Sequence, residues 1–230
     1  QRSLVGSEMC IRDRNAPWSF LGEGVTFWVT VAVLLVVGVA VYLITRKKSS
    51  NKKSFWTAKT MAVGAMCMAL SSVLSLIKLW PMPMGGSVTP ASMLPLLLFA
   101  YCYGVGPGMV LGALYGVMQF LLDGMAWAAL GAIPNLLDYP IAFGMLGLAG
   151  CFRGSKAKMT AGFVLGCFGR FMASFLSGFI FYGQHAPEGV NPVWYSLTYN
   201  GSYMLVECII CIALGLLVGE RLAKELKKVA

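Results

Sequence analysis

The chain has 230 residues, of which 58% are hydrophobic and 12% are charged, and its mean hydropathy is +0.73. Soluble domains average about 25% charged residues, so this composition excludes a soluble enzyme or binding domain and indicates a polytopic membrane protein. The net charge of +9 is concentrated at the ends of apolar segments, which indicates membrane topology and contact with anionic lipid and argues against nucleic-acid binding.

The amino-terminal segment falls into two parts. Residues 3–13 resemble the translation of a sequencing-library adapter, so we interpret residues 1–14 as a non-native scar and not as a signal peptide. Residues 15–54 contain an apolar run at 25–45, long enough to span a membrane at about 20 residues, and then a basic linker at 46–53. Because this charge follows the apolar core, we expect an extra transmembrane anchor helix whose carboxyl end is cytoplasmic.

The remaining residues, 55–230, are expected to form an all-α membrane bundle of six helices. Basic clusters follow the anchor and also lie near residues 153–158 and 221–228. Seven spans with the amino terminus outside put these clusters and the carboxyl terminus in the cytoplasm, as the positive-inside rule requires. The chain is therefore expected to be a multi-pass protein of the cell membrane. Its six core runs cover residues 56–78, 91–104 (short, but needed for this agreement), 107–122, 127–152, 159–182 and 195–219.

Asp138 is the residue around which we expect the function to be organised. It is the only Asp, Glu, Lys, Arg or His between Asp123 and Arg153. A carboxylate inside hydrocarbon is costly and marks an ion path or a ligand site, unless it is the structural partner of a buried cation. Counting 1.5 Å per residue from the cytoplasmic end puts it about 21 Å up a core about 30 Å thick.

Aromatic, hydroxyl and amide side chains are expected near Asp138, in the outer half of the bundle. They supply rings for stacking and cation–π contact, and hydrogen-bonding groups beside the acid. Such a pocket suits a flat, polar, cationic ligand. An interfacial aromatic belt explains any single tyrosine or tryptophan equally well. The side chains are Trp127, Ser174, Tyr182, Tyr195, Tyr199 and Asn200.

Arg170 and Glu207 are two further charged residues inside apolar runs. They lie about 11 and 12 residues from the cytoplasmic ends of their helices, which is a matching depth of about 17 Å. An unpaired charge at this depth is costly, so we predict a structural ion pair between the last two helices.

Residues 81–90 form a loop between the first two core helices. Their prolines and glycines exclude a helix, and the loop is long for a connection in a bundle. It is expected to be either a lid over the pocket or a simple turn. As a lid, it would act through Met84, Gly85, Gly86 and Ser87.

Small residues recur at helical spacing on two of the core helices. Ala65 and Ala69 belong to an alanine face of the first, which either packs inside the bundle or receives a partner membrane subunit. Gly108, Gly112 and Gly116 on the third predict close packing against a neighbouring helix.

The sequence carries no catalytic motif. It has no Ser/His or Cys/His pair at one depth, no HExxH and no nucleotide-binding signature. We therefore expect a transport subunit without its own ATPase, not an enzyme, and we expect no cofactor and no metal. The two-fold internal repeat of many secondary transporters is also lacking.

Short motifs follow one another along the core at residues 82–89 (MPMGGSVT), 136–140 (LLDYP), 169–171 (GRF), 177–181 (SGFIF), 195–197 (YSL) and 200–202 (NGS). In this order and spacing, over about residues 56–220, they resemble the thiamine-specific S-component of energy-coupling factor (ECF) transporters. The resemblance implies a six-helix substrate-binding subunit with its pocket near the outer face. Its implied partners are a transmembrane coupling subunit and two cytoplasmic ATPases, and the subunit is thought to topple in the membrane to release thiamine inside.

The resemblance also assigns residues. It puts the family's ligand-contacting acid at Asp138, with Tyr139 beside it, and a later tyrosine and asparagine at Tyr195 and Asn200. A ring-stacking tryptophan of some members is Tyr182 here, and a histidine of some members is Ser174. The small-residue docking face falls at Ala65 and Ala69.

The leading hypothesis is therefore a membrane subunit that captures thiamine from the outside for import. A near alternative is the same architecture with another ligand, such as a thiamine precursor or another vitamin. Alternatives from other classes are a self-sufficient secondary transporter and a structural membrane scaffold. Uptake that depends on ATPase partners would argue against a secondary transporter. A scaffold would bind no small molecule.

Overall fold

The computed structural model describes residues 57–82, 86–124, 132–183, 186–187 and 189–229. The chain divides into two units, residues 1–51 and 52–230, and every described residue belongs to the second. The expected scar at 1–14 and the expected anchor segment at 15–54 therefore lie outside the described residues.

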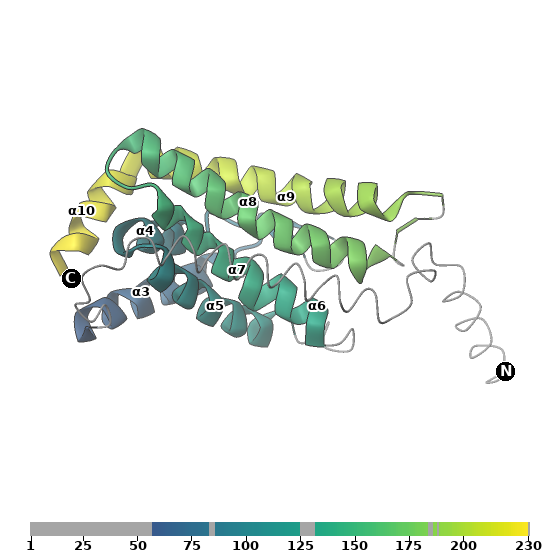
Figure 1. The fold of residues 1–230 in the computed structure, drawn as a ribbon, viewed down its shortest axis with the longest axis horizontal. Coiled ribbons are helices and arrows are strands. Elements are labelled where there is room, and N and C mark those ends of the chain that lie inside the picture. Colours follow the sequence, from purple (N-terminus) through teal and green to yellow (C-terminus); the bar gives the residue numbers. More distant parts are fainter. Residues whose placement is uncertain (1–56, 83–85, 125–131, 184–185, 188, 230) are drawn as a thin grey trace. The chain divides into compact units, whose positions relative to one another are not determined.

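Among the described residues, four helices are long and apolar enough to cross a membrane (Figure 1). The predicted class, an all-α membrane helix bundle, is thereby confirmed for this part of the chain, while the number of spanning helices stays a prediction. The four are α3 (Ala58–Leu76), α5 (Val105–Leu122), α8 (Lys156–Ile180) and α9 (Pro192–Leu214), the last continuing through a π-helical turn, η6 (Gly215–Gly219), into α10 (Glu220–Val229).

Helix α4 (Leu94–Tyr103) is shorter than the apolar run that predicts it. Its ten residues are all buried, and they extend about 15 Å, half the thickness of a hydrocarbon core of about 30 Å. The residues before it, Ala91 to Met93, are also buried but not α-helical, and Ala91 has a positive φ of 65°. Irregular backbone at membrane depth is tolerated where protein surrounds it.

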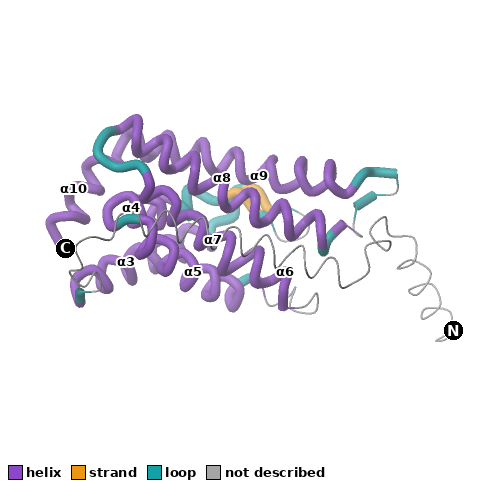
Figure 2. Tube along the Cα trace, viewed as in Figure 1, coloured by secondary structure: helices purple, strands orange, loops and turns teal. Residues whose placement is uncertain are grey.

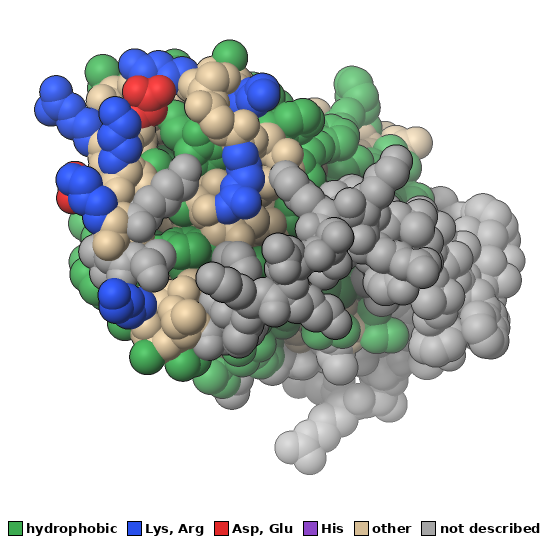
Figure 3. Space-filling view, turned by 60° about the vertical axis from the view of Figure 1, so that its left-hand side comes forward, with side chains coloured by type: hydrophobic (Ala, Val, Ile, Leu, Met, Phe, Trp, Pro, Cys, Tyr) green, Lys and Arg blue, Asp and Glu red, His purple; other side chains and the backbone are tan. Residues whose placement is uncertain are grey.

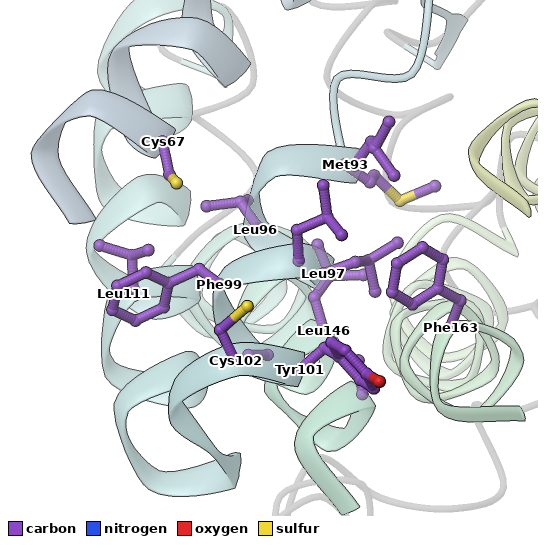
Figure 4. Close-up of a cluster of buried hydrophobic side chains, with 14 of the residues drawn as sticks. Cys67, Met93, Leu96, Leu97, Phe99, Tyr101, Cys102, Leu111, Leu146 and Phe163 are labelled. Carbon is purple, nitrogen blue, oxygen red and sulfur yellow. The ribbon is translucent and has the colours of Figure 1, made fainter. Parts of the chain in front are cut away.

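Buried side chains of α4 form the centre of the apolar core. Among the described residues, buried side chains from α3, α5, α7 (Ala142–Met145), η4 (Leu146–Cys151), α8, α9 and α10 belong to the same core, so α4 is surrounded by protein. Figure 4 shows Leu96, Leu97 and Phe99 of α4 among side chains of four other elements: Cys67 of α3, Leu111 of α5, Leu146 of η4 and Phe163 of α8.

The run that carries Asp138 folds as a helix in four short pieces: α6 (Ala132–Leu136), a π-helical turn η3 (Leu137–Ile141), α7 (Ala142–Met145) and a 3₁₀ helix η4 (Leu146–Cys151). Pro140 lies within the π-helical turn. Proline has no N–H to donate and its ring clashes with a regular α-helical turn, which accounts for the widened turn. Asp138 is therefore carried by the one wide turn of this segment.

Helix α5 packs directly on the backbone of this broken helix. A Cβ atom at Gly112 would meet the carbonyl oxygen of Phe143, and one at Gly116 would meet that of Tyr139. Only glycine leaves room for such a close approach. The close packing predicted from these glycines is confirmed, and it fixes the turn that carries Asp138 against α5.

Helices α8 and α9 lie side by side and run in opposite directions (Figure 1). Arg170 of α8 therefore lies level with Glu207 of α9, and Ser174 lies level with Asn200. These positions recur along one face of each helix, which places a polar stripe at the boundary between α8 and α9.

A short hairpin follows α3, where the sequence predicts only a loop. Strand β1 (Trp80–Pro81) pairs antiparallel with β2 (Ser87–Val88), so that Trp80 lies opposite Val88. Strand β2 contacts α9 (Figure 2). The hairpin thus brings Ser87, the last residue of the predicted lid, and Val88 to α9.

Exposed basic side chains gather at the end of the bundle where α10 lies (Figure 3). Lys156 and Lys158 belong to the start of α8, and Arg221 and Lys224 belong to α10. The basic clusters that lie far apart in the sequence therefore share one end of the molecule.

Candidate functional site

A cavity of about 140 Å³ lies between α3, the hairpin, α5, the broken helix, α8 and α9. Its lining is mostly polar or aromatic, and it contains three carboxylates, one guanidinium, and several tyrosines and serines. A cavity with convergent polar groups in an otherwise apolar bundle is a candidate ligand site.

Most residues that the sequence puts forward for binding lie on this cavity. Trp127 and two residues of the predicted lid, Met84 and Gly85, lie outside the described residues. The other lid residues, Gly86 and Ser87, line the cavity. The predicted binding residues that line it are Asp138, Tyr139, Ser174, Tyr182, Tyr195 and Asn200.

The carboxylate of Asp138 faces α8. Ser177 donates a hydrogen bond from Oγ to Asp138 Oδ2 over 2.7 Å. Ser177 is fully buried, so this bond fixes the orientation of the acid between η3 and α8. The acid lines the cavity while it is held in this way.

Asn200 is held at the middle of the polar stripe. Its Nδ2 donates to the Oγ of Ser196 over 3.2 Å and to the carbonyl oxygen of Ser196 over 3.1 Å. Its Oδ1 accepts from the hydroxyl of Tyr203 over 3.1 Å. The amide is thus oriented by its own helix before any ligand arrives.

Three tyrosines form one aromatic face on α9. The rings of Tyr195 and Tyr199 are stacked with centroids 6.0 Å apart, and Tyr199 meets Tyr203 edge-on at 5.9 Å. All three line the cavity. Tyr203 is absent from the residues expected from sequence, although its spacing of four from Tyr199 and eight from Tyr195 puts it on the same helix face.

Tyr199 also connects α9 to the hairpin. Its hydroxyl oxygen accepts a hydrogen bond from the backbone N–H of Gly86 over 3.1 Å. A Cβ at Gly86 would lie 2.9 Å from that oxygen, so the backbone approaches the ring as closely as glycine allows.

Arg170 and Glu207, which the sequence assigns to the architecture, line the cavity themselves. Arg170 NH1 lies 3.7 Å from Glu207 Oε2, and the guanidinium lies 4.1 Å from the ring centroid of Phe143. The other oxygen of Glu207, Oε1, accepts hydrogen bonds from Ser92 over 2.8 Å and from Thr89. The pair therefore ties α8 and α9 to the segment that follows β2.

A second ion pair lies at the edge of the cavity. Lys78 Nζ, just after α3, lies 2.9 Å from a carboxylate oxygen of Asp123 at the end of α5. One turn below, Ser75 donates to Gln119 Oε1 over 3.3 Å. Asp123, Gln119 and Ser75 line the cavity, and sequence reasoning missed all three as site residues because nothing in their spacing brings α3 and α5 together.

The alanine face of α3 lies outside the cavity. Ala65 and Ala69 are exposed, as are Ala58 and Ala62. Large apolar neighbours on the same helix, Met66 among them, are exposed as well. Within the described residues this face therefore does not serve as internal packing.

The charges of the cavity indicate the kind of ligand that it suits. Counted by formal charge, Asp138 and Glu207 contribute two negative charges and Arg170 one positive charge, while Asp123 is paired with Lys78. The inner cavity thus carries one uncompensated negative charge beside aromatic rings, which complements a singly charged organic cation. Among the described residues, no group of three His, Cys, Asp or Glu side chains is placed to hold a metal ion.

The fold and the cavity define a multi-pass membrane protein with a polar and aromatic cavity inside its helix bundle. The family model described as "Thiamine transporter protein (Thia_YuaJ)" matches residues 61–226. The chain belongs to this family, and the resemblance drawn from its sequence motifs is confirmed at that level.

Individual relatives agree with this assignment. The chain is 38% identical over 144 residues to thiamine transporter ThiT of Bacillus subtilis, covering 56% of this chain and 73% of the relative. It is 31% identical over 134 residues to ThiT of Lacticaseibacillus paracasei, covering 52% and 67%. A solved structure of ThiT from Listeria monocytogenes matches with a TM-score of 0.62 and 20% identity, over 74% of this chain and 96% of that one, which shows a shared fold.

Proposed function

We propose that this chain is the thiamine-binding membrane subunit of an ECF-type vitamin importer. The observation that carries the proposal is the single uncompensated negative charge of a cavity walled by tyrosines. Thiamine has two flat aromatic rings joined by a methylene bridge, with one permanent positive charge on its thiazolium ring. The names of the relatives, which are thiamine transporters, support the same ligand.

Each proposed contact except that of Trp127 uses a group that lines the cavity. Asp138 offers a carboxylate to the thiazolium charge or to the amino group of the pyrimidine ring. Tyr182 and Tyr195 offer ring faces for stacking and cation–π contact. Tyr139 adds an aromatic wall, and Ser174 and Asn200 add hydrogen-bonding groups; Trp127 is proposed as a further wall.

The hairpin loop is proposed as the lid of this site. Gly86 and Ser87 line the cavity, and Met84 and Gly85 precede them directly in the chain. The hydrogen bond from Gly86 to Tyr199 supports a closed position of the loop over the tyrosine face. Ligand exchange then requires this contact to open.

We further propose the partners and the orientation of the subunit. The basic end that contains α10 faces the cytoplasm, as the positive-inside rule favours, which puts the carboxyl terminus inside and the amino terminus outside. The exposed face with Ala65 and Ala69 is the proposed docking surface for a transmembrane coupling subunit. Energy comes from two cytoplasmic ATPases bound to that partner, since no nucleotide-binding motif occurs in this chain.

Titration of the purified chain in detergent tests the proposal. Thiamine is added while tryptophan fluorescence is followed, and calorimetry supplies an independent affinity. Saturable thiamine binding that Asp138→Asn removes, and that the exposed control Glu225→Gln retains, is the expected result. A folded protein that does not bind thiamine would refute the ligand assignment and favour a precursor or another vitamin.

Uptake into vesicles tests the mode of transport. With the coupling subunit and both ATPases reconstituted, thiamine should accumulate only when ATP is supplied. Accumulation by this chain alone would contradict the proposal and indicate a secondary transporter.

A further inference from the structure

One end of the cavity contains a guanidinium whose donors are largely unused. Arg170 Nε and NH1 are buried and have no hydrogen-bond partner among the described residues. The distance of 3.7 Å from NH1 to Glu207 Oε2 is an ion-pair distance, longer than the 2.7–3.2 Å of a direct hydrogen bond. Buried donors are almost always satisfied in proteins, so this guanidinium is poised for an acceptor that the described residues do not supply.

Glu207 has a matching free position. Its Oε1 accepts from Ser92 and Thr89, so the carboxylate is anchored and cannot turn both oxygens toward Arg170. Its Oε2 has only the long contact with Arg170 among the described residues. An oxygen atom placed between NH1 and Oε2 can lie about 2.8 Å from each, accepting from the first and donating to the second.

The position of this pair relative to Asp138 defines two polar ends of one cavity. Ser177, which holds Asp138, lies seven residues along α8 from Arg170, which is about 10 Å at 1.5 Å per residue. Ser174 lies between Arg170 and Ser177 on α8, and Asn200 of α9 donates to the carbonyl oxygen of Ser174. The cavity therefore suits an elongated ligand with a cationic or amino group at one end and an oxygen at the other.

We propose that Arg170 and Glu207 form a subsite for the alcohol at the end of the thiamine side chain, and that Glu207 selects this alcohol against its phosphate ester. The inference rests on the proposed function and specifies the far end of its ligand. An alcohol both accepts and donates a hydrogen bond, so it can bridge the two side chains. An ionised phosphate only accepts, and it would lie beside the anchored carboxylate of Glu207.

The first measurement uses the unaltered chain and two ligands. The affinity for thiamine is compared with that for the analogue that has an ethyl group in place of the hydroxyethyl group. A hydrogen bond to a charged group predicts about 10-fold or more tighter binding of thiamine. Equal affinities would overturn the subsite while leaving the proposed function intact, whereas failure to bind either ligand would overturn the proposed function itself.

A double substitution then locates the effect. Arg170→Met with Glu207→Gln removes both charges together, so no buried charge is left unpaired, and the amide still accepts from Ser92. The preference for thiamine over the ethyl analogue should disappear. Persistence of the preference would overturn the subsite. The matched control, Lys156→Met with Glu220→Gln, removes an exposed ion pair of 3.8 Å and should retain the preference.

The single substitution Glu207→Gln tests the selection against phosphate. Arg170 then keeps its charge without an anionic neighbour, so the affinity for thiamine monophosphate relative to thiamine should rise about 10-fold or more. An unchanged ratio in a variant that still binds thiamine would overturn the role given to Glu207.

Discussion

The two ion pairs of the cavity differ in a way that separates their roles. At the edge, Lys78 and Asp123 meet at 2.9 Å, and 39% and 44% of their side-chain surfaces are exposed. Inside, Arg170 and Glu207 are 3.7 Å apart, and only 12% and 2% of their side-chain surfaces are exposed. Water can satisfy the outer pair wherever the protein does not, whereas the inner pair depends on protein groups or a ligand.

The distance within an ion pair therefore does not predict how much that pair contributes to stability here. The outer pair is short but worth little, since exposed ion pairs contribute about 0–1 kcal/mol. The inner pair is long because Glu207 is held by Ser92 and Thr89, yet the loss of one partner would leave a buried charge. The following substitutions test that contrast, from the largest expected effect to the smallest.

Glu207→Ala should be the most damaging change. It leaves Arg170 as an uncompensated buried cation and removes the acceptor of Ser92, so the free energy of unfolding should fall by about 3–5 kcal/mol. Thermal unfolding in detergent measures the loss. Glu225→Ala, at an exposed acid of α10, should change stability by about 0.5 kcal/mol or less. Equal effects of the two would contradict the contrast between buried and exposed pairs.

Asp138→Asn should weaken thiamine binding by about 30-fold or more while the protein stays folded. The amide has the same size and its carbonyl oxygen still accepts from Ser177, but the uncompensated negative charge of the cavity is lost. Calorimetric titration gives the affinity, and unfolding temperature monitors the fold. Retained affinity would show that the charge of the ligand is met elsewhere.

Tyr199→Phe should accelerate thiamine release about 5-fold, because Gly86 loses its hydrogen-bond acceptor, worth about 1 kcal/mol. Stopped-flow fluorescence measures the dissociation rate. Tyr103→Phe is the matched control, since that hydroxyl donates to the carbonyl oxygen of Leu226 on α10. A faster release in the control alone would argue against a lid held by Tyr199.

Lys78→Met should have the smallest effect, at most about 1 kcal/mol on the free energy of unfolding. The difference from the unaltered chain should shrink further in high salt, because exposed charges are screened. A loss as large as that of Glu207→Ala, insensitive to salt, would show that the outer pair is a structural element in its own right.

The sequence was most informative at charged residues inside apolar runs, because a charge is costly to place in a membrane. An acid in an apolar run pointed to Asp138, which lines the cavity, although its role in binding stays a prediction. Depth counting put Arg170 level with Glu207, and the structure places the two in contact. The depth of a residue in a straight helix follows from the rise of 1.5 Å per residue. Residues at the same depth on two helices can therefore be predicted without a tertiary structure.

Other features depend on tertiary contacts that no local pattern shows. The hydrogen bond between Thr89 and Glu207 joins residues 118 positions apart. The wide turn that carries Asp138 follows from Pro140, but its packing against α5 depends on Gly116 of another helix. The start of α4 at Leu94 was also unpredictable, because composition does not distinguish buried irregular backbone from helix.

The enclosed position of α4 has a consequence for how the chain is made. A helix of ten residues is too short to remain in a bilayer alone. Its neighbours Leu146 and Phe163 are synthesised about 40 and 60 residues after its last residue, Tyr103. Insertion of α4 must therefore wait for later helices, so assembly of this bundle cannot proceed strictly from one end of the chain to the other. Nascent chains stopped before α8 should leave α4 open to labelling of Cys102 by a water-soluble thiol reagent, and completion of α8 should protect it.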